Sequence, residues 1–374
     1  MRILFLSKRR YMSHDVIVDR YARMYEFPYQ LARWGHAVLA CCLSYRSAEE
    51  GHWPHPSAPG SLEWRSWNLG RAVLPGLFRF RHQALAAARA FKPDLVLGAS
   101  DIPHCVLARH LARQLDVPYA LDLYDNFESF GQARIPGAVA ALRWAARGAA
   151  FISCVSEPLT EFVRSSYGAA CPVVTLESTV DRSVFKPAVR SASRVRLGLP
   201  QEAKLVGTAG SLSSEKGITV LYEAFRILAA RRPDVHLVVA GPVEASTPPP
   251  SGSNVQVLGL LPHADVATLF SALDVAVICI RDTPFGRFCF PQKAYEMLAC
   301  QVPVVAADIG AMKTLLQPFP DSLYRAEDAS SLAAQLERQL SRPTVAAVPI
   351  KSWEDLGAEL EFGLRRALAG AGAS

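Results

Sequence analysis

Short apolar runs alternate with amphipathic stretches along nearly the whole chain. Ten apolar runs predict buried strands: 2–7, 37–44, 95–100, 119–124 and 151–156 in the first half, and 204–210, 236–241, 255–260, 275–280 and 303–308 in the second. Apolar residues at helical spacing separate them, as in YARMYEFPYQLARWG (21–35) and IPHCVLARHLARQL (102–115). Because this alternation is typical of parallel sheets with helices on both faces, it predicts an α/β protein with two separate sets of units.

Polar segments interrupt the pattern. The stretch 181–203 is polar and broken by proline, which predicts a linker, and the proline-rich stretch 241–253 predicts a surface loop. The last stretch, 352–370, predicts a helix whose apolar face carries Trp353, Leu356, Leu360 and Leu364. That face needs a partner surface.

The composition narrows the class of protein. The chain has 374 residues, half of them apolar and a fifth charged, which suits two folded domains and excludes a disordered or fibrous protein. Its eight cysteines are scattered without a CxxC pair, so we expect neither a disulfide framework nor a zinc site, and a reducing cytoplasm is the simplest setting. No apolar run reaches the roughly 18 residues of a membrane span, and the start becomes basic too early for a secretory signal.

Positive charge is concentrated between Trp64 and Lys92. This stretch has six basic residues, no acidic residue and several large apolar side chains, within a chain of net charge +6. One interpretation is a surface that contacts an anionic membrane, and the other is a solvated basic helix face. Nucleic acid is not an expected partner, because no nucleic-acid-binding motif accompanies the charge.

A candidate phosphate site follows the first strand of the second half, in GSLSSEKG (210–217). Gly210 permits close approach to the backbone, the following helix offers free N–H groups, and Lys216 adds a mobile positive charge. Together they suit a diphosphate. The alternative is an ordinary serine-rich helix cap with Lys216 in solvent.

A second candidate site lies in FGRFCFPQKAYEMLACQVPVVAADIG (285–310). Gly286 and Arg287 lead to Pro291 and to a helix that carries Glu296 among apolar neighbours. A carboxylate is costly to bury unless it accepts hydrogen bonds, and the two hydroxyls of a ribose can donate them. Alternatively, Glu296 lies on the exposed side of its helix.

A family resemblance emerges from the order of several segments. They include QLARWGHAV, KPDLVLGAS, VPYALDLYD, STVDRSVFKP, GSLSSEKGITVLYEAF, HLVVAGP and FPQKAYEMLACQVPVVAADIGAM. In this order, and over nearly all 374 residues, the chain resembles a GT-B glycosyltransferase of the family-4 type. The resemblance implies two Rossmann-like, doubly wound parallel-sheet domains facing a cleft. Residues 1–185 would bind the acceptor, 186–350 would bind the nucleotide sugar, and the final helix, in 351–374, would cross back to the first domain.

The resemblance also implies roles for individual residues. Lys216 would contact the donor diphosphate, and Glu296 would contact the ribose. The other expected donor-binding positions are Gly210, Ser211, Gly217, Leu258 to Leu261 beside the nucleobase, and the backbone of Cys289, Phe290 and Pro291.

The chain departs from the family pattern at three positions. Ser211 stands where relatives often have a basic residue, so either Arg287 supplies the second cation or donor binding is weaker. Phe288 stands in place of the first of two glutamates, which would bind the donor sugar. Tyr124 replaces a histidine that normally touches the donor sugar and the reacting phosphate.

The acceptor side is less defined. Lys8, Arg9 and Arg10 follow the first strand and would suit an anionic lipid-diphosphate acceptor, or they form a charged loop without a ligand. Asp125, a candidate catalytic residue, and His104, a candidate acceptor ligand, follow later strands, and each faces either the cleft or solvent.

The expected reaction is transfer of a sugar, with retention, from a nucleoside diphosphate sugar to a glycan or lipid-linked hydroxyl. Lys216, a helix N-terminus and Arg287 would stabilise the leaving diphosphate, which itself accepts the proton. We expect no metal, since no Asp-x-Asp signature is present, and no cofactor beyond the co-substrate. Analogy suggests bacterial envelope polysaccharide synthesis in the cytoplasm, either free or on the inner face of the membrane.

Three alternatives remain open. A GT-B protein that binds nucleotide sugar or a partner without transferring would explain Ser211, Phe288 and Tyr124. A nucleotide-sugar epimerase would release a sugar isomer. A Rossmann oxidoreductase is disfavoured, because the first turn lacks G-x-G-x-x-G.

Overall fold

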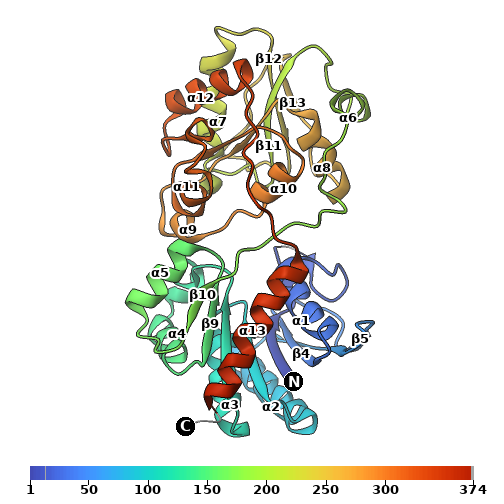
Figure 1. Cartoon of the computed structure of the whole chain (residues 1–374), viewed down its shortest axis with the longest axis vertical. Coiled ribbons are helices and arrows are strands. Elements are labelled where there is room, and N and C mark those ends of the chain that lie inside the picture. The colour runs from blue at the N-terminus through green and yellow to red at the C-terminus, as the bar shows by residue number, and fades with distance from the viewer. Residues whose placement is uncertain (13, 372–374) are drawn as a thin grey trace. The chain divides into compact units, whose positions relative to one another are not determined.

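The computed structural model describes residues 1–12 and 14–371, and the chain divides into two compact units (Figure 1). Unit 1 comprises Met1–Thr179 and the segment from Lys351 onward, and unit 2 comprises Val180–Ile350. The boundary expected at 185/186 therefore lies at 179/180 in the structure. The final helix belongs to unit 1.

Unit 1 is built on an eight-stranded sheet in the order β10-β9-β8-β7-β1-β4-β6-β5. Neighbouring strands are parallel except for the antiparallel pair β5–β6. The strands are β1 (Arg2–Lys8), β4 (Ala37–Ser44), β5 (Gly51–His55), β6 (Ser61–Asn68), β7 (Leu95–Ala99), β8 (Tyr119–Leu123), β9 (Phe151–Cys154) and β10 (Val173–Thr175). Two short strands, β2 (Arg10–Tyr11) and β3 (His14–Asp15), form a separate antiparallel ribbon.

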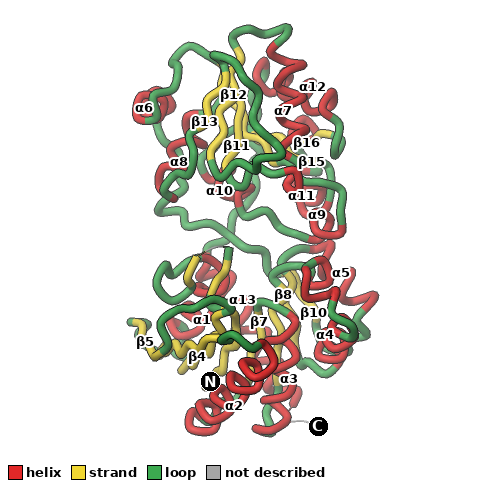
Figure 2. The backbone as a smooth tube through the Cα atoms, turned by 180° about the vertical axis from the view of Figure 1, so that it is seen from behind, coloured by secondary structure: helices red, strands yellow, loops and turns green. Residues whose placement is uncertain are grey.

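Helices cover both faces of this sheet. The helices α1 (Ala22–Arg33) and α13 (Trp353–Ala371) pack on one face, and α2 (Val73–Phe91) and α3 (Ile102–Leu115) pack on the other (Figures 1 and 2). The predicted apolar face of the last helix is buried in the core that α1 shares with the sheet, with Leu360 and Leu364 fully inaccessible. The remaining helices are α4 (Ala138–Arg147), α5 (Glu157–Ser166) and the 3-10 turns η1 (Phe127–Ser129) and η2 (Gly131–Arg134).

Unit 2 contains a six-stranded, fully parallel sheet in the order β13-β12-β11-β14-β15-β16. Its strands are β11 (Lys204–Ala209), β12 (Val235–Ala240), β13 (Val255–Val257), β14 (Val275–Ile278), β15 (Val304–Ala307) and β16 (Leu323–Tyr324). The helices are α6 (Arg190–Arg196), α7 (Ile218–Ala229), α8 (His263–Ala272), α9 (Pro284–Phe288), α10 (Lys293–Ala299), α11 (Gly310–Leu316) and α12 (Ala329–Ser341), with 3-10 turns η3 (Ser214–Lys216) and η4 (Pro320–Ser322). Both units are Rossmann-like, as the family resemblance implies.

Two segments differ from the sequence-based expectation. The basic stretch from Trp64 begins inside β6, where Leu62 and Trp64 are buried on one face of the strand. The linker predicted at 181–203 is wrong in part, because it contains α6. Arg194 anchors that helix, since its buried guanidinium lies 2.7 Å from the carboxylate of Asp274 and also donates to the Ala272 carbonyl.

Candidate functional site

The sheet of unit 2 changes direction between β11 and β14. From β11 the chain goes first to β12 and β13 on one side, and then returns to β14, β15 and β16 on the other. Ligands of open parallel sheets bind beyond the carboxyl ends of the strands at such a point. The two predicted donor segments, 210–217 and 285–310, begin in the connections that follow β11 and β14 and therefore meet there.

Lys293 and Glu296 lie one turn apart on α10 at this point. The Lys293 ammonium donates to the Ala209 carbonyl at 3.1 Å, which places it at the end of β11. Glu296 is buried, and burial raises its pKa to about 7, with nearby Lys293 and a hydrogen bond from Gln292 opposing part of the rise. Burial also lowers the pKa of Lys293. The interpretation of Glu296 as an exposed helix residue is therefore wrong.

Lys216 approaches the same point from η3. Its Nζ lies 4.0 Å from the ring centroid of Phe285 in α9, a cation–π distance. Arg287 also belongs to α9, but its exposed guanidinium is paired with Asp282 at 2.5 Å. Exposed pairs of this kind contribute little to stability, so the pairing does not hold Arg287 firmly. Its predicted role on the diphosphate stays a prediction.

The turn after β11 brings several backbones close together. Gly210 has φ +119, and a Cβ at this residue would lie 3.4 Å from the Lys293 Nζ. A Cβ at Gly241, after β12, would lie 1.9 Å from the Gly210 carbonyl oxygen. Glycine at these two positions lets the loops approach each other and leaves Lys293 beside the Gly210 backbone.

Several backbone amides of the predicted phosphate turn already have partners. Four of them donate to backbone carbonyls, those of Gly210, Leu212, Lys216 and Gly217. The Ser214 N–H donates to the carboxylate of Glu244 at 2.9 Å. Moreover, α7 begins only at Ile218, after the η3 turn and Gly217. This turn therefore has fewer free amides than the sequence predicted. One reason is that Glu244, in the loop 241–253 after β12, accepts a hydrogen bond from the turn.

The other predicted donor residues lie at the carboxyl edge of the same sheet. Leu258 to Leu261 directly follow β13, with Leu260 largely exposed. Cys289 and Phe290 are buried between α9 and α10, and the Cys289 N–H donates to the Phe285 carbonyl. Since Pro291 has no N–H, Phe290 is the residue of these three whose amide can serve a ligand.

Unit 1 has its own switch point, between β1 and β7. The Lys8 N–H donates to the Ser100 hydroxyl at 2.8 Å, joining the ends of these two strands. The Lys8 ammonium lies 2.6 Å from the hydroxyl of Tyr124, which follows β8. Burial lowers the pKa of Lys8, and the charges of Asp101 and Asp125 oppose that shift. Lys8, Tyr124 and Asp125 therefore form one cluster.

His104 lies deeper. Its Nδ1 is 2.5 Å from the Asp101 carboxylate, which also accepts from the Tyr45 hydroxyl at 2.7 Å. Burial alone would raise the pKa of Asp101, but the contacts with His104 and Tyr45 outweigh it and lower that pKa. His104 is 1% exposed, packed against Phe80, so the expectation of a histidine facing an acceptor or solvent is wrong for this structure.

The three basic residues after β1 differ in their surroundings. Arg9 is 3% exposed and donates to Asp15 at 2.7 Å, to the Ser66 hydroxyl at 3.2 Å and to the Glu49 carbonyl. Its guanidinium therefore holds the loop in place, which argues against its predicted role as an acceptor ligand. Arg10 is exposed in β2. The acceptor role stays a prediction for Lys8 and Arg10.

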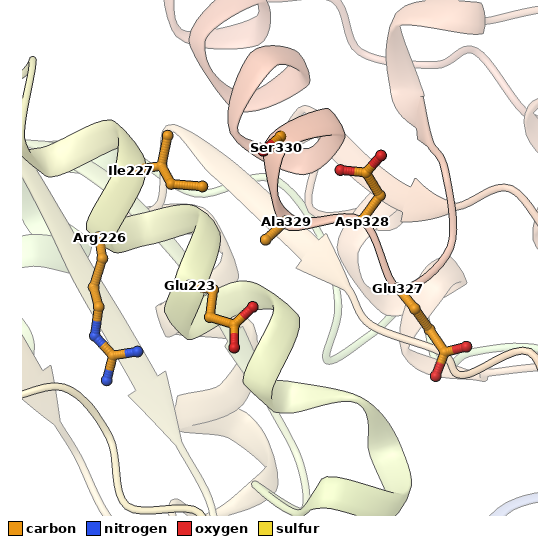
Figure 3. Close-up of a pocket in the computed structure, with 7 residues that line it drawn as sticks. All are labelled: Glu223, Arg226, Ile227, Glu327, Asp328, Ala329 and Ser330. Carbon is orange, nitrogen blue, oxygen red and sulfur yellow. The ribbon is translucent and has the colours of Figure 1, made fainter.

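A surface hollow between α7 and the start of α12 is separate from these clusters (Figure 3). It is lined by Glu223, Arg226, Ile227, Glu327, Asp328, Ala329 and Ser330, none of which is a predicted site residue. Two of its three acidic side chains are engaged, Glu327 with Arg281 and Asp328 with Arg325. Within residues 1–12 and 14–371, no group of three or more His, Cys, Asp or Glu side chains is placed to hold a metal ion.

Two Rossmann-like units, each with charged groups at its switch point, are typical of a GT-B protein. Comparison with known families gives the same assignment. Residues 22–179 match the model of the glycosyl transferase 4-like domain, and residues 203–342 match the model of glycosyl transferases group 1. The chain therefore belongs to the GT-B glycosyltransferases of the family-4 type.

Curated relatives agree with this assignment. The chain is 27% identical over 294 residues to TuaC of Bacillus subtilis, a glycosyltransferase assigned to teichuronic acid biosynthesis, covering 78% of this chain and 72% of the relative. It is 29% identical over 212 residues to the D-inositol 3-phosphate glycosyltransferase of Segniliparus rotundus, where the match spans 51% of this chain and 46% of the relative.

Solved structures share the fold over nearly the whole chain. Sucrose-phosphate synthase of Thermosynechococcus elongatus superposes with a TM-score of 0.74 at 18% identity, covering 98% of this chain and 94% of that one. Anabaena HepE in complex with UDP superposes with a TM-score of 0.69 at 18% identity, covering 99% and 97%. At this level of identity the likeness concerns the fold.

Sequence reasoning missed Lys293. The sequence feature that could have indicated it is the spacing of three residues between Lys293 and Glu296, which puts both side chains on one side of α10. Nothing local, however, indicated that this side lies against the end of β11.

Proposed function

We propose that this glycosyltransferase moves a sugar from a nucleoside diphosphate sugar to a hydroxyl of a glycan or lipid-diphosphate-linked acceptor, with retention and without a metal. The observation that carries the proposal is the placement of Lys216, Lys293 and Glu296 at one switch point. Two ammonium groups suit the two phosphates, and the buried carboxylate suits the ribose hydroxyls. The charge that develops on the departing diphosphate would be stabilised there.

Lys293 would supply the cation that the family pattern lacks at Ser211. Its Nζ lies beside Gly210 and donates to a carbonyl at the end of β11, whereas Arg287 is paired with Asp282. A lysine in contact with a backbone carbonyl keeps two further N–H donors for a ligand. This arrangement favours a transferring enzyme over the alternative of a protein that only binds nucleotide sugar.

The acceptor would bind at the Lys8 cluster of unit 1. Lys8 and Arg10 are cationic, and Lys8 is held by Ser100 and Tyr124. An anionic acceptor fits this charge. Because TuaC is assigned to teichuronic acid biosynthesis, a bacterial envelope polysaccharide is the product class we propose.

A direct assay tests the function. Thermal unfolding with a panel of UDP-, GDP-, ADP- and TDP-sugars should reveal one donor that raises the unfolding temperature, because a ligand of the folded state stabilises it by mass action. UDP-glucose is the first choice, since HepE has been solved with it. That donor should yield product with a lipid-linked glycan extract, equally in the presence of EDTA. Stabilisation without any product would instead favour the binding protein.

Glu296 gives a pH-dependent prediction. Its pKa in the folded protein, about 7, lies above the ordinary glutamate value, so the folded state keeps a proton that the unfolded chain releases. Its contribution to stability is therefore complete below about pH 4.3, the ordinary glutamate pKa, and is lost as the pH rises through about 7. From pH 5 to pH 8, Glu296→Gln should gain stability relative to the parent in thermal unfolding.

The matched control is Glu223→Gln, an exposed glutamate on α7 of the same unit. The difference in thermal stability between Glu223→Gln and the parent should stay constant over this pH range. In donor titrations, the parent should bind more tightly as Glu296 ionises, whereas the affinity of Glu296→Gln should be lower and flat with pH. If stability and donor affinity changed with pH in the same way for Glu296→Gln and the parent, the raised pKa and the ribose-binding role of Glu296 would be ruled out.

We also propose that the start of α2 contacts an anionic membrane surface. Val73, Leu74 and Phe78 are 57%, 68% and 65% exposed, and the exposed Arg71 lies beside them. Arg79 is engaged by Glu50 at 3.0 Å and by the Asn68 carbonyl. None of the helices in the described part of the chain is both long and apolar enough to cross a bilayer. The apolar side chains would insert at the interface, with the cation at the headgroups.

The double substitution Leu74→Gln and Phe78→Gln should lower sedimentation with phosphatidylglycerol vesicles at least about tenfold, since burying each side chain is worth roughly 1.5–3 kcal/mol. Val195→Gln, which changes an equally exposed apolar residue on α6, should leave sedimentation unchanged. Equal loss in both proteins, or none in either, would refute the membrane contact.

A further inference from the structure

An apolar groove runs along the edge of the unit 1 sheet, between α13 and the strands β9 and β10. Its volume is about 790 Å³, within the range of ligand pockets. We call it the α13 groove. It is lined by Gly148, Ala149, Ala150, Phe151, Pro172, Val174, Thr175, Leu176, Ala358, Glu359, Phe362, Gly363, Arg366, Ala367 and Gly370. Most of these residues offer only hydrocarbon or backbone to an occupant.

Several polar groups along the groove already have partners. The Thr175 hydroxyl bonds to Glu157 and Thr160, and the Glu359 carboxylate bonds to Lys351. The Ala150 N–H donates to the Tyr119 carbonyl. A ligand with many polar groups would lose hydrogen bonds to water here without replacing them, so the groove selects an apolar occupant.

The edge strand does not suit an added peptide strand. β10 has only three residues, and the Val173 carbonyl is covered by the Arg164 guanidinium at 2.7 Å. Strand addition depends on a row of free backbone groups at the sheet edge. On the opposite wall, Phe362 is 63% exposed, and the Arg366 guanidinium lies over its ring. The long stem of Arg366 extends that apolar wall.

The groove leads to the acceptor side of the sheet. Gly148 to Ala150 precede β9, whereas Leu176 follows β10, so the groove extends from the amino edge of the sheet to its carboxyl edge. At that edge the Leu176 carbonyl accepts from Arg23, which is paired with Asp122 at 2.6 Å, two residues before Tyr124. Since one strand separates β10 from β8, the groove's end lies about 10 Å from the end of β8.

We propose that the α13 groove binds the hydrocarbon chain of a lipid-phosphate acceptor, whose anionic head lies at Lys8 and Arg10. The proposal rests on the proposed function for the identity of its occupant. The charge of the two basic residues complements the phosphate, and the groove at the same sheet edge complements the chain. The enzyme would thereby recognise both parts of a lipid-linked acceptor within unit 1.

Calorimetric titration of the full chain tests the groove. Farnesyl diphosphate should bind at least about tenfold more tightly than inorganic pyrophosphate, because only the former buries apolar surface. Ala358→Trp fills the groove and should remove this advantage while leaving pyrophosphate binding unchanged. The control is Ala369→Trp, which makes the same change on the exposed side of α13, outside the groove, and should bind as the parent does.

A second variant covers the case in which Ala358→Trp fails to fold. Phe362→Ala changes an exposed side chain, so it should fold normally, and it should weaken farnesyl diphosphate binding about threefold. Equal affinity of the parent for farnesyl diphosphate and pyrophosphate would overturn the proposal. So would equal affinities of the parent, Ala358→Trp and Phe362→Ala for farnesyl diphosphate.

The test separates the groove from the proposed function. Loss of vesicle binding in Ala358→Trp, with farnesyl diphosphate binding intact, would identify a membrane lipid as occupant and overturn the acceptor assignment. Transfer by Ala358→Trp to a chainless acceptor at the parent's rate, with reduced transfer to the lipid-linked one, supports the groove. Absence of transfer by the parent with every donor and acceptor would overturn the proposed function, whereas farnesyl diphosphate binding would still report on the groove.

Discussion

Replacing Lys216 by alanine should lower kcat for sugar transfer about 100-fold, while the protein remains folded. Removing one preorganised group that stabilises developing charge costs about 10²–10³ in kcat, or roughly 2.7–4 kcal/mol. The effect on donor affinity should be smaller, because the diphosphate gains charge mainly as the bond to the sugar breaks. The contact of Lys216 with Phe285 is partly exposed, so its loss should cost little stability. Initial rates at saturating donor measure the change.

The control is Lys313→Ala, which removes an exposed lysine from α11 in the same unit and should keep the parent's rate. Lys293→Ala should resemble Lys216→Ala in kcat, and its donor affinity should fall as well, since Lys293 is held beside Gly210 before the donor arrives. A Lys216→Ala enzyme within twofold of the parent would remove Lys216 from the proposed donor site.

Replacing Arg23 by methionine should destabilise unit 1 by about 3–5 kcal/mol, because it leaves a buried carboxylate without its partner. Arg23 and Asp122 are both fully inaccessible. The guanidinium donates to both oxygens of Asp122, at 2.6 to 3.2 Å, and to the Leu176 carbonyl. In the variant, only the Ser153 hydroxyl would still donate to that carboxylate among the side-chain contacts seen in the described residues.

The chain offers a probe specific to this unit. All six tryptophans, Trp34, Trp53, Trp64, Trp67, Trp144 and Trp353, lie in unit 1, so their fluorescence during urea unfolding reports on unit 1 alone. Arg33→Met, an exposed change on the same helix, should leave the midpoint in place. Adding Asp122→Leu to Arg23→Met should recover part of the loss, since the unpaired charge is then removed. Exposed ion pairs contribute at most about 1 kcal/mol to stability. If Arg23→Met lowered the free energy of unfolding of unit 1 by less than this, the buried pair would contribute no more than a surface pair.

Residues at the candidate donor site differ in how far the sequence predicted them. Lys216 and Glu296 stand within recognisable segments, and periodicity left open whether Glu296 is buried. Lys293 lies in the same segment as Glu296, but no motif or periodicity marked it as a ligand-binding residue. Arg9 and His104 looked like candidate ligands because they follow strands, yet Asp15 and Asp101 bind them within the fold. Both partners are near in sequence, six residues from Arg9 and three from His104. What the sequence left open was that the fold buries Arg9 and His104, so that their side chains serve these partners and not a ligand.

The chain's own sequence determined the alternation of strands and helices, the two sets of units and the apolar face of the last helix, because each follows from local periodicity in burial. The tertiary structure decided which strands are neighbours. Placing β14 beside β11 brings Lys293 and Phe285 to the Gly210 turn, and placing β7 beside β1 brings Ser100 to Lys8. Strand order depends on packing among all the helices and strands of a unit, which is a property of the whole core rather than of any one segment.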